Sequence, residues 1–173
     1  MRKIIFALSL VLSLFIIVTF LLGLKTKKIY DTIDLTGKPI PNLDLNLLNG
    51  DTNFNTQDLK KNKFTLINFW ASWCAPCRKE HEHLISLNDN KNLKILGVNF
   101  KDKKSKANQF IKELGNPYYL IVSDTDGKKS LSFGIYGIPE TILVNKDLII
   151  IKKYIGPINA QDVKTIQKMI REE

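Results

Sequence analysis

The sequence predicts an α/β protein in which a mixed central sheet is flanked by helices, with one membrane-spanning helix at the N-terminus. Three observations support this prediction. An uncharged apolar run occupies residues 4–24. Short apolar segments then alternate with amphipathic ones over the remainder of the chain. Finally, two cysteines follow one of the apolar segments closely.

The length and charge of the chain limit the class of protein. Its 173 residues suit one domain plus an accessory segment, and 44% hydrophobic residues are enough to build a core. The formal net charge is +9, but basic residues concentrate around the apolar run (Arg2, Lys3, Lys25, Lys27 and Lys28). The other lysines, Lys152 and Lys153 among them, are interspersed with acids, which is typical of a solvated surface. We therefore expect no nucleic-acid partner.

The apolar run is long enough to span a membrane. Its 21 uncharged residues rise to roughly 30 Å as a helix, the thickness of a bilayer core. A cleaved signal peptide would have a shorter run and a small-residue cleavage site, whereas Lys25-Thr26-Lys27-Lys28 follows here. We expect an uncleaved anchor over residues 1–28, a tether over 29–37 and one domain over 38–173. Basic residues on both flanks leave the orientation open.

A hairpin is predicted at the start of the domain. Gly37, Pro39 and Pro41 disfavour regular structure before it. Residues 43–47 are then separated from a second short segment by Asn49-Gly50-Asp51, a strong turn signal. The hairpin would form an N-terminal extension of the main sheet.

Strands and helices alternate through the middle of the chain. The apolar, β-rich segment 64–70 predicts a buried strand, and a helix should begin near Cys74 to Pro76 because proline suits a first helical turn. Further on, we expect a strand over 93–100, an amphipathic helix over 104–114 and a strand over 118–122.

The C-terminal part predicts a turn, a second hairpin and a last helix. Residues 124–127 form the turn, and strands 141–144 and 148–154 pair across Asn145-Lys146-Asp147. Asn159 should cap a helix with one apolar side. The order β–α–β–α–β–(α)–β–β–α is that of a mixed sheet covered by helices.

Cys74 and Cys77 are the only cysteines, and a disulfide between them would close too small a loop to add much stability. Such a pair is typical of redox chemistry or metal binding. A cysteine at a helix start forms its thiolate readily, because the helix dipole favours negative charge there. We expect Cys74 to be exposed on an apolar platform that includes Trp73, and Cys77 to lie deeper. Disulfide exchange needs this asymmetry.

A metal site is the alternative for this pair. His81 and His83 complete a C-x2-C-x3-H-x-H pattern that resembles zinc-ligand spacing. On a helix, however, these two histidines point about 200° from one another, and no second cysteine pair follows. We favour redox chemistry with no metal and no cofactor, and expect His81 to be packed and His83 to lie at the surface.

Glu80 is the candidate proton carrier. Helical spacing of about 100° per residue places it near the direction of Cys77. A poorly solvated carboxylate there would have a raised pKa and could exchange a proton with Cys77. A solvent-facing glutamate is the alternative that the residues alone leave open.

Several segments resemble the thioredoxin superfamily. Residues 68–77 are similar to its active-site strand and turn, and Ile138-Pro139 falls where that family carries a cis-proline; the residues by themselves predict only a trans turn. Within the superfamily, residues 77–81, 97–102, 112–118 and 134–141 resemble the DsbE/CcmG group of cytochrome c maturation proteins, in the TlpA-like branch.

This resemblance implies a thioredoxin-like fold and a specific task. Proteins of this group face the bacterial periplasm on an inner-membrane anchor and are kept reduced by a membrane electron donor. They reduce disulfides in apocytochrome c or in its thiol-handling partners, so that haem can be attached. The expected partners are therefore these thiol proteins, that donor and the membrane.

The resemblance also assigns roles to residues. Cys74 would attack and Cys77 would resolve, Glu80 and Glu140 would make the site acidic, and the remaining substrate contacts would come from Trp73, Ile138 and Pro139. Two features depart from the pattern. Asn68 replaces the buried aspartate of ordinary thioredoxins, which leaves Glu80 as the proton carrier, and Ile138 is bulkier than the residue often found before the proline. The alternatives are a broader periplasmic disulfide reductase and a metal- or haem-handling binding module.

Overall fold

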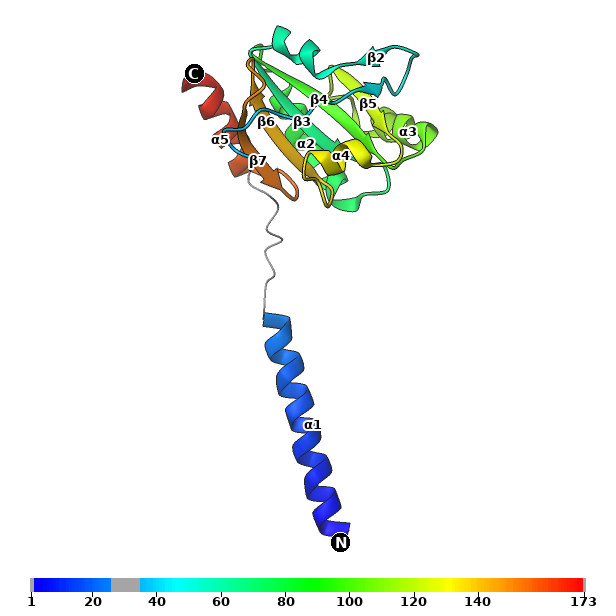
Figure 1. Ribbon diagram of the computed structural model, residues 1–173, viewed down its shortest axis with the longest axis vertical. Coiled ribbons are helices and arrows are strands. Elements are labelled where there is room, and N and C mark those ends of the chain that lie inside the picture. Colours follow the sequence, from blue (N-terminus) through cyan, green and yellow to red (C-terminus); the bar gives the residue numbers. More distant parts are fainter. Residues whose placement is uncertain (1, 26–34, 173) are drawn as a thin grey trace. The chain divides into compact units, whose positions relative to one another are not determined.

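The computed structural model describes residues 2–25 and 35–172, which divide into two units at Asp31/Thr32. The first unit is helix α1 (Arg2–Lys25), drawn in blue in Figure 1. Its segment Arg2–Gly23 has a mean hydropathy of 3.0 and is long and apolar enough to cross a membrane. Most of the tether expected over residues 29–37 lies outside the described residues.

The second unit contains a five-stranded mixed sheet in the order β5-β4-β3-β6-β7 (Figure 1). Its strands are β3 (Phe64–Trp70), β4 (Leu93–Phe100), β5 (Leu120–Asp124), β6 (Glu140–Asn145) and β7 (Ile150–Ile155). The first three are parallel, whereas β6 and β7 run antiparallel to their neighbours. All seven residues of β3 are buried because it is the central strand and both of its faces are covered.

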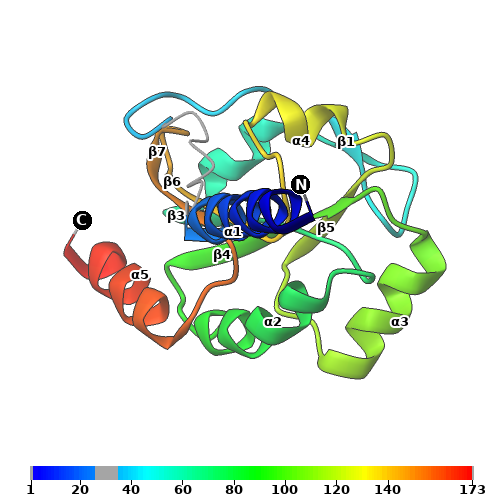
Figure 2. The same cartoon turned by 90° about the horizontal axis from the view of Figure 1, so that it is seen from below.

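Helices cover both faces of this sheet (Figure 2). On one face lie α2 (Ala75–Leu87), α3 (Lys104–Leu114) and α5 (Ala160–Glu172), and on the other lies the short α4 (Lys128–Ser132). Alternate residues of β3 therefore enter different cores: Leu66 packs in the cluster with α2 and α5, and Ile67 packs in the opposite cluster. The predicted α/β fold with a mixed sheet and flanking helices is confirmed.

The predicted N-terminal hairpin is also present. Strands β1 (Leu45–Asn46) and β2 (Asn53–Phe54) pair antiparallel and are followed by the 3-10 helix η1 (Thr56–Lys61). The hairpin is attached to the edge of the main sheet, since the Leu48 N–H donates to the Ile121 carbonyl at 2.8 Å. It extends the fold beyond β5.

Strands β5 and β7 each begin two residues later than the sequence predicts, β7 at Ile150 instead of residue 148. Strand β5 starts at Leu120 instead of residue 118, and its pairing with β4 begins at Leu96–Leu120. The Tyr118 N–H is instead bound by the Asn116 side chain at 3.0 Å, and the Tyr118 ring is buried under the sheet. The asparagine thus satisfies the Tyr118 N–H locally, and the first backbone hydrogen bond to β4 is made by the Tyr119 N–H to the Ile95 carbonyl at 3.0 Å.

Candidate active site

The two cysteines form a disulfide at the N-terminus of α2. The S–S distance is 2.04 Å and the Cα atoms are 5.3 Å apart. Cys74 is the N-cap of the helix, and its sulfur accepts the Cys77 N–H at 3.2 Å. The sulfur of Cys74 therefore lies at the positive end of the helix dipole, where a thiolate is stabilised after reduction.

The prediction that Cys74 is exposed and Cys77 lies deeper is wrong for the disulfide-bonded protein. Cys74 is 3% exposed and Cys77 is 2% exposed. Cys74 is covered because the loop that ends at Pro139 lies against it, with the Ile138 carbonyl oxygen 3.7 Å from its sulfur. The two sulfurs differ in position instead, since one caps the helix and the other lies within it.

The peptide bond between Ile138 and Pro139 is cis, as the resemblance leads us to expect. It immediately precedes β6, and the Ile138 side chain is half-buried between the two hydrophobic cores. The backbone of Ile138 thus lies directly beside the disulfide.

Trp73 is the large exposed side chain next to the disulfide, with 59% of its surface accessible. Its indole N–H donates to the Lys101 carbonyl at 3.1 Å, so the ring is held at one edge while its face remains open. The Trp73 ring therefore provides the exposed apolar surface that was predicted beside Cys74.

Glu80 is buried, not solvent-facing. It is 1% exposed and lies one turn after Cys77 on the same helix. Its carboxylate accepts the Asn68 side-chain amide at 2.8 Å and the Ile158 N–H at 2.9 Å. Burial raises the pKa of Glu80 to about 7, although both hydrogen bonds favour the ionised form. The structure thus provides a carboxyl group that changes its protonation near neutral pH, next to the cysteine pair.

Asn68 organises the buried polar groups around Glu80. Its amide also donates to the Thr141 hydroxyl at 2.9 Å, and its oxygen accepts the Tyr118 hydroxyl at 2.9 Å. These residues come from β3, β6 and the segment before β5, and burial holds the pKa of Tyr118 well above its usual range. Neither Tyr118 nor Thr141 has a local sequence signal for this role, because strand pairing brings Thr141 to Asn68 and Tyr118 reaches Asn68 from the segment before β5.

The two histidines differ in their surroundings: the His81 ring contacts the Tyr118 ring edge-on, with centroids 6.2 Å apart. His81 is buried, packs edge-on against Phe110 with ring centroids 5.0 Å apart, and its Nε2 is 3.0 Å from the Gly115 carbonyl oxygen. Burial lowers the pKa of His81, which favours its neutral form. His83 is partly exposed beside Glu82. The packed His81 matches the prediction.

Glu140 forms a buried ion pair with Lys153, and the expectation that Lys153 belongs to the solvated surface is wrong. Their charged atoms are 2.8 Å apart, and their side chains are only 3% and 5% exposed. The other Glu140 oxygen accepts the N–H groups of Tyr136 and Gly137, each at 3.2 Å. Lys153 also donates to the Gly134 carbonyl at 2.7 Å. The pair therefore holds the loop that carries Ile138 and Pro139 at several points.

This geometry changes what Glu140 can do. Its carboxylate faces the interior and is neutralised by Lys153, so it does not offer a free charge to a bound peptide. Any effect on substrate binding would run through the backbone of the loop. The sequence gives no local signal for this pair, because Lys153 is opposite Ile142 and comes diagonally close to Glu140 only through the register of β6 on β7.

Comparison with known families gives one extended match. A family model described as Redoxin matches residues 35–170. The thiol:disulfide interchange protein HelX of Rhodobacter capsulatus is 41% identical over 131 residues, which cover 76% of this chain and 73% of that protein. The thiol:disulfide interchange protein DsbE of Escherichia coli is 41% identical over 126 residues, covering 72% of this chain and 68% of DsbE.

Solved structures agree with these relatives. The thioredoxin domain of a thiol-disulfide oxidoreductase from Bacteroides vulgatus has a TM-score of 0.67 at 26% identity, over 78% of this chain and 97% of that one. A thiol:disulfide interchange protein from a Bacteroides species has a TM-score of 0.67 at 27% identity, over 79% and 90%. Residues 35–170, which the family model matches, include the disulfide, Glu80 and the cis-proline loop.

Proposed function

Since the chain belongs to the Redoxin family and is a thiol:disulfide oxidoreductase similar to DsbE and HelX, we propose that it is a membrane-anchored reductase of cytochrome c maturation. It would reduce disulfides in apocytochrome c, or in the thiol proteins that handle it, before haem is attached. The observation that carries this proposal is the Cys74–Cys77 disulfide at the N-terminus of α2, with the Ile138 backbone beside it.

The reaction begins with the reduced protein. Cys74, stabilised as a thiolate at the helix N-terminus, attacks one sulfur of the substrate disulfide and forms a mixed disulfide. Cys77 then attacks the Cys74 sulfur and releases the substrate as a dithiol. Two electrons pass from the protein to the substrate, and the protein is left with the Cys74–Cys77 disulfide of this structure.

Glu80 is suited to accept the proton that Cys77 must lose. Its pKa of about 7 means that a large fraction is ionised at neutral pH and can take up a proton. Replacement by glutamine should alter the pH dependence of thiol exchange near pH 7, with Glu82→Gln on the exposed side of the same helix as control. An identical pH profile for Glu80→Gln and the wild type would remove Glu80 from the mechanism.

The order of attack can be tested by trapping. A Cys77→Ser chain should accumulate a mixed disulfide through Cys74, whereas a Cys74→Ser chain should accumulate none. Accumulation through Cys77 in the Cys74→Ser chain would reverse the assignment of the two roles.

The direction of electron flow can be tested in cells. Alkylation of thiols should show Cys74 and Cys77 reduced when a membrane electron donor is active and oxidised when that donor is deleted. A pair that is fully oxidised with the donor present would identify an oxidant and refute the reductase proposal.

The substrate and location are tested separately. Deletion of the gene should lower the amount of holocytochrome c, and labelling with a membrane-impermeant reagent should place the domain in the periplasm, with α1 as its inner-membrane anchor. Normal holocytochrome c in the deletion strain would favour a reductase of broader specificity.

A further inference from the structure

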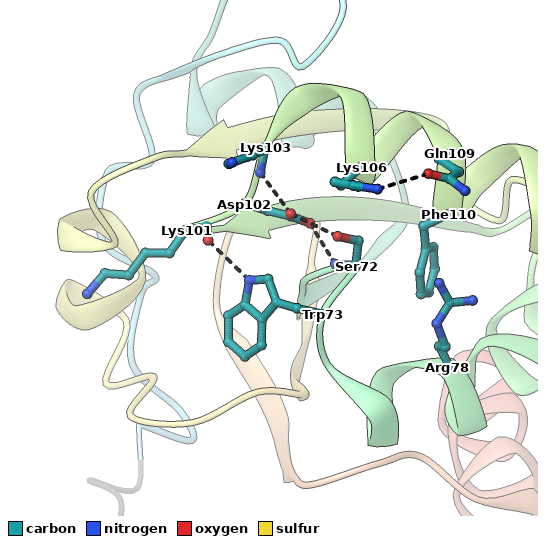
Figure 3. A pocket seen from close by; sticks show the side chains of 9 residues that line it. All are labelled: Ser72, Trp73, Arg78, Lys101, Asp102, Lys103, Lys106, Gln109 and Phe110. Atoms are coloured by element: carbon teal, nitrogen blue, oxygen red, sulfur yellow. Dashed lines mark hydrogen bonds between the residues drawn. The ribbon is translucent and has the colours of Figure 1, made fainter.

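A groove opens beside the disulfide, and four of the nine residues that line it are cationic (Figure 3). It has a volume of about 520 Å³ and is bordered by Trp73, which precedes Cys74, and by Arg78, which follows Cys77. The connection from β4 to α3 and the first turns of α3 supply Lys101, Lys103 and Lys106. Any protein that brings a disulfide to Cys74 therefore meets this groove.

The single carboxylate that lines the groove, Asp102, is occupied by the fold. It accepts the N–H and hydroxyl of Ser72 at 2.6 and 2.9 Å, the Asn99 amide at 3.1 Å and the Lys103 N–H at 2.8 Å. These bonds fix the connection against the segment that carries Trp73. Asp102 keeps its negative charge, so the groove lining holds four cations against one carboxylate and is positive on balance.

The cations differ in how far they are already paired. The Arg78 guanidinium lies over the Phe110 ring, 4.8 Å from its centroid, and forms an ion pair with Glu113 at 3.3 Å. Arg78 is therefore a fixed part of the groove wall. Lys106 donates to the neutral side chain of Gln109 at 3.5 Å. Within the described part of the chain, neither Lys103 nor Lys106 has an ion-pair partner. These two exposed lysines are the charges most available to a partner.

We propose that this groove binds an acidic segment that flanks the disulfide of the protein's substrate. This inference rests on the proposed reductase function and adds a rule for substrate choice. Complementary charge accelerates encounter and fixes orientation. Here it would align the partner along Trp73, with its disulfide at the Cys74 sulfur and its backbone beside Ile138. An acidic segment is the fitting occupant because the groove lies next to the reactive pair and offers several separate cations.

The test uses the full-length reduced chain in detergent and three oxidised peptides. The peptides share one Cys-x-x-Cys disulfide and differ only in a flanking run of four glutamates, glutamines or lysines. In each reaction the peptide disulfide gains two electrons and two protons while Cys74 and Cys77 become a disulfide. Stopped-flow tryptophan fluorescence follows the rate, because Trp73 adjoins the new bond.

The glutamate peptide should react about tenfold faster than the glutamine peptide at about 10 mM ionic strength, where the Debye length is about 30 Å. The preference for the glutamate peptide should vanish at about 1 M ionic strength, where the Debye length is about 3 Å. Lys103→Gln with Lys106→Gln should bring the ratio of the two rates close to one. Lys91→Gln with Lys94→Gln is the matched control: it removes the same charge from exposed lysines at the opposite end of β4, and should retain most of the preference.

The outcomes separate this proposal from the proposed function. If the glutamine peptide is not reduced at all, the reductase function fails. If it is reduced but the glutamate peptide is no faster, or if the two double variants lose the preference equally, the groove proposal is wrong.

An anionic membrane surface is the competing occupant. Brominated phosphatidylglycerol in nanodiscs would quench the tryptophan fluorescence if the groove rests on lipid. Two results together would overturn the proposal in favour of a lipid site. The lipid would quench the fluorescence of the wild type but not of the Lys103→Gln, Lys106→Gln double variant, and the glutamate peptide would react no faster than the glutamine peptide. Strong glutamate preference without such quenching would support it.

Discussion

The side-chain amide of Asn68 donates a 2.8 Å hydrogen bond to the carboxylate of Glu80, in a site where both residues are almost completely buried. Asn68 lies on the central strand and Glu80 on the helix that carries the cysteines. The neutral amide of Asn68 therefore stands where ordinary thioredoxins carry the carboxylate of a buried aspartate. Among the residues that the structure describes, Glu80 is the one carboxyl group that bonds directly to this network, and its pKa is about 7.

The raised pKa of Glu80 makes stability depend on pH. The unfolded chain releases this proton near pH 4.5, whereas the folded protein keeps it to about pH 7. The folded state binds more protons in this window, so the contribution of Glu80 to stability falls as pH rises through it, by about 3 kcal/mol in total. Glu80→Gln should remove this slope.

Guanidinium unfolding of the oxidised full-length chain in detergent, at pH values from about 4 to 8, would measure the effect. Glu82→Gln, at an exposed position of the same helix, should retain the wild-type slope. A slope that survives in Glu80→Gln would show that other groups cause it.

Replacement of Asn68 by aspartate should create a strained pair of acids. A second carboxylate would stand about where the amide now lies, 2.8 Å from Glu80, and the two cannot both ionise in a buried site. We expect a loss of about 3 kcal/mol or more above pH 7 and a smaller loss near pH 4. Asn68→Asp combined with Glu80→Gln leaves one acid and should recover much of the stability at high pH. No recovery would mean that packing, not charge, causes the loss.

The buried Glu140–Lys153 pair should be costly to break on one side only. Lys153→Met or Glu140→Gln alone leaves an uncompensated buried charge, which costs about 3–5 kcal/mol in denaturant unfolding. The double variant should lose less than the sum of the two single variants. Lys168 and Glu172, an exposed pair on α5, are the control and should show less than about 1 kcal/mol of coupling. Additive losses at Glu140 and Lys153 would contradict a coupled pair.

Gly97 is required by the aromatic packing next to the network. A Cβ at this position would lie 2.9 Å from Trp70 Nε1 and 2.9 Å from the Tyr118 ring, and these rings stack with centroids 5.5 Å apart. Gly97→Ala should therefore destabilise the protein by about 1–3 kcal/mol. Gly137→Ala meets no atom within 4 Å and should change stability by less than about 0.5 kcal/mol. Thermal unfolding of both variants would test this; equal stability would show that the rings can move apart.

Several features could be predicted because they depend on neighbouring residues. The spacing of Cys74 and Cys77, the proline in the first helical turn and the apolar pattern of β3 are all local, and they correctly indicate a disulfide at a helix start after a buried strand. Helical spacing also placed Glu80 on the side of Cys77. It could not show that Glu80 is buried, since that depends on how α2 packs on the sheet.

The sequence by itself determined the order of the elements, the candidate membrane span and the position of the cysteine pair, because periodicity, length and spacing are properties of short segments. Only the tertiary structure decided the low exposure of Cys74, the pairing of Glu140 with Lys153 and the cationic groove beside Trp73. Each of these depends on residues far apart in the chain. Strand register and helix packing bring such residues together, and a shift of one residue in register would turn their side chains to the opposite face.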